Sequence, residues 1–293
     1  MDTNRPISRS AFLKLSTRWL AGLLAAPITG FSYSRWLEPK WIETNYLQLP
    51  YTSLPRAFHL KKIVLFSDIH LDFHFGIHRL GQLIERIRKL KPDLICFTGD
   101  LFHESVESHA SSTIRLLSLL EAPLGKWAVL GNHDYTAGAK DVERVLSSGG
   151  FTLLRNRSVT LEHGGSQIRI AGLDDALEGS PNLDFALADE GSREHDPAAF
   201  TLFLAHEPDL AEYAASYRVN LQLSGHSHGG QVRIPLVGPL ILPDLARRYP
   251  EGLYRIADEM YLYTNRGIGV SSYPVRFLCR PELTVITLES TEA

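Results

Sequence analysis

Five short polar segments contain side chains of the types that bind divalent metals, and each segment follows an apolar run. The segments are Ser67-Asp68-Ile69-His70, Thr98-Gly99-Asp100, Gly131-Asn132-His133-Asp134, His206-Glu207 and Gly225-His226-Ser227-His228. Imidazole and carboxylate ligands without thiolate suit Mn, Fe, Zn, Ni or Co. In an extended segment, Asp-x-His and His-x-His spacing places both side chains of a pair on one side. We therefore predict a metal centre built from these segments.

The chemistry expected of this set is that of a two-metal site. A carboxylate that bridges two cations holds them about 3.5–4 Å apart, the usual separation in two-metal hydrolases. Gly99, Gly131 and Gly225 come just before predicted ligands, and we expect them to let the backbone turn sharply there. Each motif is weak evidence alone, whereas all five in this order indicate a metal site.

Strands and helices alternate along the chain in a pattern that would bring these segments together. Apolar runs predict strands at 62–66, 94–97, 127–130, 200–205 and 221–224, each ending in one of the polar segments. Helical spacing predicts helices over 77–90, 113–120 and 139–148. Further strands are expected at 159–161, 167–173, 254–256, 261–263 and 283–288, and a polar exposed insertion at 178–196. The order predicts an α/β fold with a two-layer sheet core covered by helices, and ligand sites in such folds lie beyond the carboxyl ends of strands.

Composition is that of a globular protein. The chain has 293 residues, 44% of them hydrophobic and 22% charged, which is long enough to form a core without disulfides or structural metals. A net charge of −3 argues against binding to nucleic acid polymers. Cys96 and Cys279 are predicted to be two unpaired structural thiols, with a single disulfide as the alternative.

Residues 1–41 form a basic, apolar segment ahead of a domain predicted over 42–293. The apolar stretch 19–31 is shorter than the roughly 18–20 residues of a membrane span, and it follows Ser8-Arg9-Ser10-Ala11-Phe12-Leu13-Lys14. That heptad resembles the twin-arginine export consensus, but Ser10 replaces the second arginine. We prefer an uncleaved anchor at the membrane; a cleaved signal and a helix packed on the domain are the alternatives. The predicted location is membrane-associated or exported to the cell envelope.

The motifs as a set resemble the calcineurin-like metallophosphoesterase superfamily. The resemblance covers roughly residues 60 to 290. Gly229-Gly230-Gln231, Pro235-Leu236-Val237-Gly238, Thr264-Asn265-Arg266-Gly267 and Cys279-Arg280-Pro281-Glu282 narrow it to the bacterial YkuE/YaeI-type phosphodiesterase subgroup. It implies a four-layer α/β/β/α sandwich with two mixed β-sheets flanked by helices, and a cofactor of two divalent metal ions, with Mn favoured over Fe, Zn, Ni or Co.

The resemblance also implies a role for each matching residue. Asp68, His70 and His228 would hold one metal. Asn132, His206 and His226 would hold the other, and Asp100 would bridge the two. His133 is the expected acid for the leaving group, and Asp134 is expected to orient it or to stabilise its charged form. His74, His103 and Arg266 are candidates for substrate contact.

The predicted function is metal-dependent hydrolysis of a phosphodiester or pyrophosphate by a monomer that contacts a membrane through its N-terminal segment. Residues 234–243 are almost wholly apolar; exposed beside the metals they would form a hydrophobic lip and favour a lipid-linked substrate, and the alternative is that they are buried. A phosphodiesterase acting on a cell-wall polymer or a small nucleotide is the second hypothesis. A non-catalytic metal-binding scaffold is the third.

Overall fold

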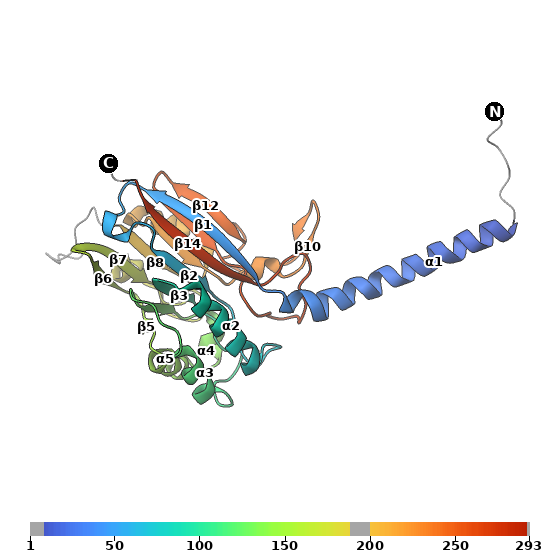
Figure 1. Ribbon diagram of the computed structural model, residues 1–293, viewed down its shortest axis with the longest axis horizontal. Coiled ribbons are helices and arrows are strands. Elements are labelled where there is room, and N and C mark those ends of the chain that lie inside the picture. Colours follow the sequence, from blue (N-terminus) through green and yellow to red (C-terminus); the bar gives the residue numbers. More distant parts are fainter. Residues whose placement is uncertain (1–8, 188–199, 292–293) are drawn as a thin grey trace.

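Two six-stranded mixed β-sheets packed face to face form the core of the computed structural model, which describes residues 9–187 and 200–291 (Figure 1). The first sheet has the order β1 (Glu43–Tyr51), β14 (Glu282–Ser290), β2 (Lys62–Phe66), β3 (Leu94–Thr98), β4 (Lys126–Val129) and β5 (Thr152–Leu153). The second has the order β12 (Gly252–Ala257), β13 (Met260–Thr264), β9 (Leu221–Ser224), β8 (Thr201–Leu204), β7 (Ser166–Gly172) and β6 (Arg157–His163).

The alternation of side chains along each strand produces the layers. In β2, Ile63 and Leu65 pack into the apolar core between the sheets, whereas Val64 and Phe66 face the helices on the outer side. Three helices cover that outer face: α2 (Ile77–Leu90), α3 (Ala110–Leu117) and α5 (Ala139–Ser148). The short helices α6 (Leu183–Leu187) and α7 (Ala211–Ala214) cover the outer face of the second sheet. The predicted four-layer sandwich is therefore confirmed.

Most predicted elements lie within a few residues of their observed bounds. Helices α2 and α5 have the predicted ends, and burial of Leu80, Leu83, Ile84 and Ile87 on one side of α2 explains its periodicity. Several observed elements were not predicted, and the longest strand among them is β1, which pairs in parallel with β14 at the edge of the first sheet. Its first residues are only partly buried, so its sequence lacks a continuous apolar run.

The segment 178–196 is not simply an exposed insertion. Ala186 and Leu187 of α6 are buried against the second sheet, so the prediction is wrong for this part. Residues 188–199 lie outside the described residues. Cys96 and Cys279 are both buried and unpaired, as predicted.

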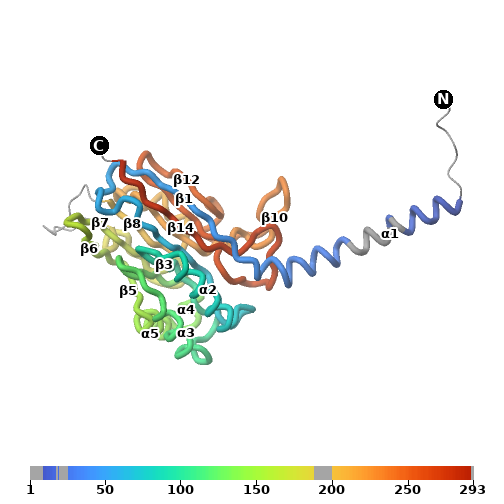
Figure 2. Tube along the Cα trace, in the orientation of Figure 1, coloured from blue at the N-terminus to red at the C-terminus, as the bar shows by residue number. Residues whose placement is uncertain are grey.

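Helix α1 (Arg9–Ser32) extends away from the domain (Figure 2). Phe12, Leu13, Trp19, Ile28 and Phe31 on it are exposed, so the alternative of a helix packed along the domain is wrong. Among the residues that the structure describes, no helix combines the length and the apolar character needed to cross a membrane. The next residues, 33–41, form short helical turns that connect α1 to β1.

Candidate metal centre

All five polar segments lie at the carboxyl ends of strands on one rim of the sandwich. Asp68 and His70 follow β2, Asp100 follows β3, and Asn132 begins the short helix α4 (Asn132–Thr136) just after β4. His206 follows β8, and His226 and His228 follow β9. Because β2, β3 and β4 are parallel to one another, as are β8 and β9, each sheet delivers its polar ends to one edge.

The first ligand cluster contains Asp68, His70 and His228. The Nε2 atoms of His70 and His228 lie 3.0 Å apart, and His228 Nε2 lies 3.4 Å from Asp68 Oδ1. All three side chains are buried, and one ligand atom of each lies within 4.8 Å of the others. Converging ring nitrogens and a carboxylate at these separations can hold one divalent cation.

The second cluster contains Asp100, His206 and His226, and it adjoins the first. His206 Nε2 lies 3.3 Å from Asp100 Oδ2 and 3.2 Å from His226 Nδ1. The same Asp100 Oδ2 lies 3.4 Å from His70 Nε2 of the first cluster. Asp100 therefore stands between the two clusters, where a bridging carboxylate belongs.

Asn132 gives a direct test of whether cations fit here. Its Oδ1 atom is buried and accepts no hydrogen bond from any part of the chain that the structure describes. A buried carbonyl oxygen without a donor is costly, and a cation in the second cluster would satisfy it. The residues present therefore fit a pair of divalent ions.

The backbone at the site is held in a rarely adopted conformation. Positive φ angles occur at Asp68 (53°), His70 (48°), Asp100 (60°), His226 (66°) and His228 (49°). Non-glycine residues occupy this region infrequently, and such strain gathers at functional sites because the surrounding structure imposes it.

The three glycines that precede ligands serve different purposes, so the expectation of three sharp turns is only partly right. Gly99 has φ of +97°. Gly131 and Gly225 do not have positive φ; they are needed for space, because a Cβ at Gly131 would lie 2.6 Å from His206 Cε1 and a Cβ at Gly225 would overlap Ser67. The metal ligands pack directly against these two backbones.

The electrostatics of the site favour binding of cations. Burial lowers the pKa values of His70 and His228 well below the ordinary value and that of His226 to about 4, so their lone pairs are free at neutral pH. Burial opposes ionisation of Asp100, but the neighbouring His206 holds the pKa of that carboxyl well below its usual range. Conversely, although burial disfavours its charged form, Asp100 raises the pKa of His206.

Metal binding should weaken below about pH 6. Burial raises the pKa of Asp68 to about 6 in the metal-free protein, although His206 opposes the shift. Below that value a proton must leave Asp68 before it can bind a cation, in addition to the proton that His206 must lose because its pKa is raised, so affinity for Mn²⁺ should fall by at least about tenfold per pH unit. Calorimetric titration with Mn²⁺ at about pH 5 and about pH 7.5 tests this. Equal affinities would contradict it.

Asp134 does not orient His133, contrary to the expectation. Its buried carboxylate accepts hydrogen bonds from the backbone N–H groups of Asp100 and Gly131 at Oδ2 and of Leu101 and Phe102 at Oδ1. Burial and the nearby charge of Asp100 raise the pKa of Asp134 to about 7. Asp134 is therefore a positioning residue that ties the Asp100 loop to the Asn132 loop.

His133 and His103 lie together beside the first cluster. Their rings stack with centroids 4.6 Å apart, and His133 Nδ1 lies 3.1 Å from the backbone oxygen of His103. His103 Nδ1 also lies 3.2 Å from His70 Nδ1. His74 is exposed, with Nδ1 3.4 Å from a guanidinium nitrogen of Arg35, and it is not among the residues that line the cleft.

Arg266 is not available to bind a phosphate, so that expectation is corrected. Its guanidinium pairs with Glu282 at 2.6 Å and with Glu43 at 2.8 Å. These two ion pairs fix the guanidinium group and connect β1 and β14 to the loop after β13. An arginine in a polar sequence gives no signal that acids distant in the chain will pair with it.

Arg276 was missed, although it is the largest fully buried side chain. It donates to the carbonyl oxygens of Gly267, Gly269 and Cys279, and its Nη2 lies 3.4 Å from His228 Nδ1. Arg276 therefore helps to position the metal ligand His228 through the ring nitrogen that does not face the cluster. The signal available in the sequence was one charged residue inside the apolar run Pro274-Val275-Arg276-Phe277-Leu278-Cys279.

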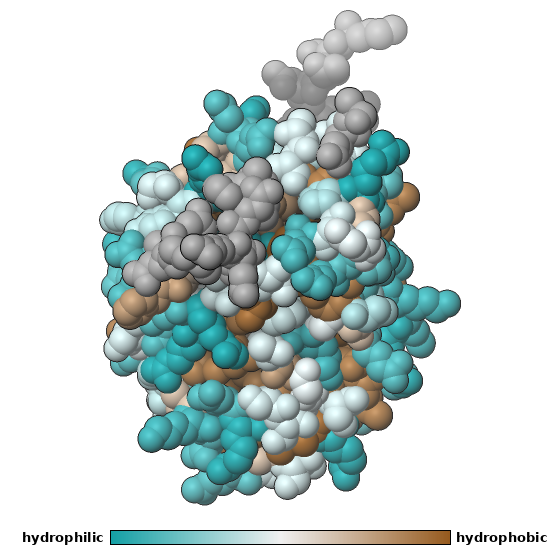
Figure 3. Space-filling view, turned by 90° about the vertical axis from the view of Figure 1, so that its left-hand side faces the viewer, coloured by the Kyte–Doolittle hydropathy of each residue, from teal (hydrophilic) through white to brown (hydrophobic). Residues whose placement is uncertain are grey.

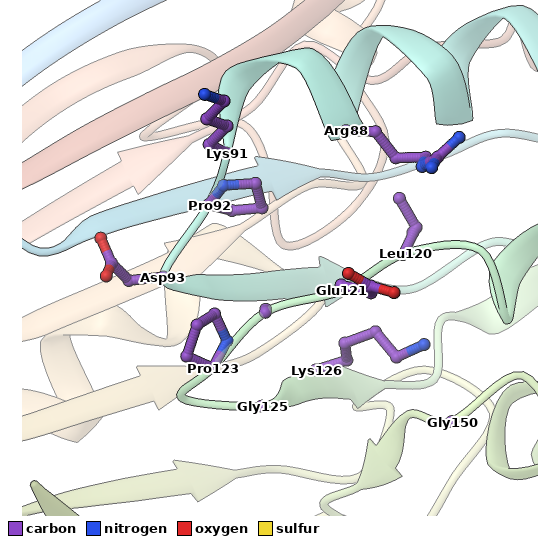
Figure 4. Close-up of a pocket in the computed structure, with 11 residues that line it drawn as sticks. Arg88, Lys91, Pro92, Asp93, Leu120, Glu121, Pro123, Gly125, Lys126 and Gly150 are labelled. Carbon is purple, nitrogen blue, oxygen red and sulfur yellow. The ribbon is translucent and has the colours of Figure 1, made fainter.

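A cleft of about 460 Å³ opens onto the ligands. Its lining combines polar residues of the metal segments, among them Asp100, Asn132, His133, His226 and His228, with the less polar Val232, Leu240, Ile241, Pro243, Tyr273 and Val275. A hollow of about 740 Å³ lies at the opposite edge of the first sheet, where β3 and β4 begin (Figure 4). No histidine lines that hollow, and its Lys126 donates to backbone carbonyls, so it does not resemble a metal site.

Fold and site together define a metallohydrolase with adjoining clusters that could bind metal, and comparison with known proteins agrees on the class. Residues 61–230 match the family model described as calcineurin-like phosphoesterase. The chain belongs to this family and is a metal-dependent phosphoesterase.

Three relatives show how far the likeness extends. The chain is 42% identical to the uncharacterized metallophosphoesterase YkuE of Bacillus subtilis, over 98% of this chain and 99% of the relative. It is 32% identical to the phosphodiesterase YaeI of Escherichia coli over 96% and 99%. It is 28% identical to the UDP-2,3-diacylglucosamine pyrophosphatase LpxG of Chlamydia muridarum over 92% and 96%. The predicted YkuE/YaeI-type subgroup is therefore confirmed.

Proposed function

We propose that the protein hydrolyses a phosphodiester or pyrophosphate bond in a lipid-linked substrate at the cell envelope. The observation that carries this proposal is the mixed lining of the cleft, in which metal ligands and apolar side chains of residues 232–243 line the same cavity. A phosphate would lie against the ligands while an acyl chain lies against the apolar side chains. The named activities of YaeI and LpxG, a phosphodiesterase and a pyrophosphatase of a diacylated nucleotide sugar, support the same class of substrate.

The seven ligands divide between two cations in this proposal, with Mn the favoured metal. Asp68, His70 and His228 would hold one cation, Asn132, His206 and His226 would hold the other, and Asp100 would be shared between them. When bound, two such cations lower the pKa of water towards neutrality and neutralise charge on phosphoryl oxygens. The complete ligand set argues against a non-catalytic scaffold.

His133 is the proposed acid for the leaving oxygen. It lines the cleft beside the ligands. Its Nδ1 faces the carbonyl oxygen of His103 at 3.1 Å, which fixes the ring and leaves Nε2 to carry the proton that is transferred. His103 stacks on the same ring and holds it in place, which makes His103 a positioning residue.

Replacing His133 with glutamine should lower kcat by about 10²–10³-fold without loss of bound metal. The decrease should be larger for an alkyl phosphodiester than for a nitrophenyl diester, because nitrophenolate leaves without protonation. Steady-state kinetics on both substrates, with metal content measured in parallel, test the role. His78→Gln, at an exposed histidine on α2, is the matched control. Equal decreases for both substrates would argue that His133 acts only through binding.

A substrate screen with purified protein and added Mn²⁺ tests the proposed function. It compares a nitrophenyl phosphodiester, a nitrophenyl phosphomonoester, a UDP-linked acyl sugar and the corresponding UDP-linked sugar without acyl chains. We expect hydrolysis of the diester and preference for the acylated substrate. Hydrolysis of the monoester alone would overturn the proposal, and equal rates on acylated and unacylated substrates would favour a cell-wall polymer or a small nucleotide.

The N-terminal segment 1–41 is proposed to hold the catalytic domain, 42–293, at the membrane as a monomer. Its exposed apolar side chains on α1 and its excess of Lys and Arg support contact with an anionic lipid surface. Fractionation of cells that express the full chain would place it in the membrane fraction, and its release by high salt alone would contradict apolar anchoring.

A further inference from the structure

A small hairpin beside the cleft carries highly exposed apolar side chains at its tip and just after its second strand. The hairpin consists of β10 (Arg233–Ile234) and β11 (Gly238–Pro239), joined by Pro235, Leu236 and Val237. Leu236 is fully exposed at 108%, and Val237 and Ile241 are 70% and 69% exposed. Residues 234–243 are therefore not buried under the C-terminal strands, which was the alternative expected from the sequence.

We propose that this hairpin inserts into a lipid bilayer and docks the mouth of the cleft at the level of the phosphate headgroups. The inference rests on the proposed function for its biological purpose, but the insertion itself is independent of catalysis. It adds a second membrane contact to that of the N-terminal segment. Insertion of the hairpin would explain why the apolar lining of the cleft continues outward into the hairpin.

The backbone of the hairpin suits an apolar medium. Residues 234–243 contain no charged or hydrogen-bonding side chain. Pro235 and Pro239 have no N–H group, and the N–H groups of Val237 and Leu240 donate to Ile234 and Val232 inside the hairpin. Because each unpaired backbone donor in hydrocarbon costs several kcal/mol, this tip enters lipid at a lower cost than an ordinary loop.

Hydrogen bonds and a ring contact connect the hairpin to the loop that follows His228 and to the base of α1. Phe277 accounts for both contacts: its N–H donates to Gln231, its carbonyl oxygen accepts from Arg233, and its ring contacts Tyr33 edge-on at 6.4 Å. The N–H of the preceding Arg276 donates to the backbone oxygen of Ser34. Direct contacts therefore link the segment after the metal ligand His228, the base of the hairpin and the start of the domain.

Helix α1 and the hairpin leave the same end of the molecule (Figure 1). Phe31, Trp36 and Leu37 near the base of α1 are exposed, as is Leu278. The face at the other end, away from α1, shows hydrophilic side chains interspersed with hydrophobic ones (Figure 3). Two apolar projections on one end favour a bilayer over a folded protein partner, because hydrocarbon accepts a projecting tip without a matching surface.

The charge of the N-terminal segment also favours a lipid bilayer as the partner of the hairpin. Residues 1–40 contain six Lys and Arg residues and two acids. One of those acids, Glu38, is buried and accepts the N–H groups of Leu278 and Cys279. In the turns that adjoin the hairpin, Arg35 and the exposed Lys40 therefore have no exposed acid beside them in residues 33–40, and anionic lipid headgroups attract such cations.

A fluorescent probe on the hairpin tests insertion separately from any binding by α1. Both native cysteines are buried, so Leu236→Cys in the full chain can be labelled with an environment-sensitive dye. Leu60→Cys is the matched control, since Leu60 is 55% exposed, has φ of 61° against 69° for Leu236, and lies before β2 at the opposite edge of the sheet.

Anionic vesicles of phosphatidylcholine and phosphatidylglycerol should shift the dye at position 236 to the blue and expose it to lipid-borne quenchers, while the dye at 60 is unchanged. Leu236→Asp should lower vesicle partitioning about tenfold and Leu60→Asp should not.

Vesicle-bound protein with the dye at 236 still in water would overturn the proposal. A blue shift without vesicles that grows with protein concentration would also overturn it, because the hairpin would then contact a second copy. Asp100→Ala labelled at position 236 should respond as the parent does, so failure of the catalytic proposal leaves this result intact.

Discussion

Replacing Asp100 with alanine should lower kcat/KM on a nitrophenyl phosphodiester by at least about 10³-fold, because it removes a ligand from both clusters at once. Asp100 Oδ2 lies 3.4 Å from His70 Nε2 and 3.3 Å from His206 Nε2. Loss of its charge leaves the imidazoles of the two clusters without their shared acceptor. Metal content by mass spectrometry should fall with activity.

The same substitution at an exposed acid separates this effect from a general loss of charge. Asp141 on α5 pairs only with the exposed Arg144 among the described residues, and Asp141→Ala should keep full activity. Circular dichroism of Asp100→Ala should remain that of the parent, because the sheets do not depend on this side chain. Retained activity in Asp100→Ala with Mn²⁺ present would refute the assigned metal centre.

Replacing Asp134 with asparagine should lower the free energy of unfolding by about 3 kcal/mol and reduce bound metal. The amide of asparagine can accept at one atom only, so its NH₂ group would face two backbone N–H groups that now donate to the carboxylate. Those N–H groups belong to the loops of Asp100 and Asn132, so the distance between two ligands would change. Chemical denaturation and metal analysis measure the two effects.

Asp93→Asn is the matched control for this variant. Asp93 accepts from the backbone N–H of Lys62 and from the Lys61 ammonium group at the opposite edge of the sheet. We expect a modest change in stability and unchanged metal content. If Asp134→Asn bound metal as the parent does, Asp134 would stabilise the fold without positioning the ligands.

The local elements were predictable because their signals are local. Helix α2 has its predicted ends since its apolar residues recur at helical spacing, and β2 and β3 are short apolar runs that end in polar residues. Strand β1 was missed because its edge position leaves alternate residues partly exposed. The partner strand β14 lies more than 200 residues later in the chain, and no local pattern records that pairing.

The sequence also does not reveal the partners of individual charged residues. Asp134 follows His133 directly, which favoured a role beside it, yet its carboxylate points to the backbone of a different loop. Arg266 lies in a ligand-rich region, yet Glu43 and Glu282 from β1 and β14 occupy it. Which partner each residue meets depends on distances across the fold. Residue type and spacing along the chain carry no information about those distances.

By itself, the sequence determined the chemistry of the centre, because it supplies oxygen and imidazole ligands in a fixed order. The alternate spacing within each Asp-x-His or His-x-His pair places both ligands on one side of a segment. Only the tertiary structure decided that Asp100 stands between two clusters, because that position requires the ends of two separate sheets to meet at one rim. Tertiary structure likewise decided that residues 234–243 project into solvent beside the cleft. An apolar loop can be buried or exposed with the same sequence, and the bonds that Phe277 makes to its base hold it outside the core.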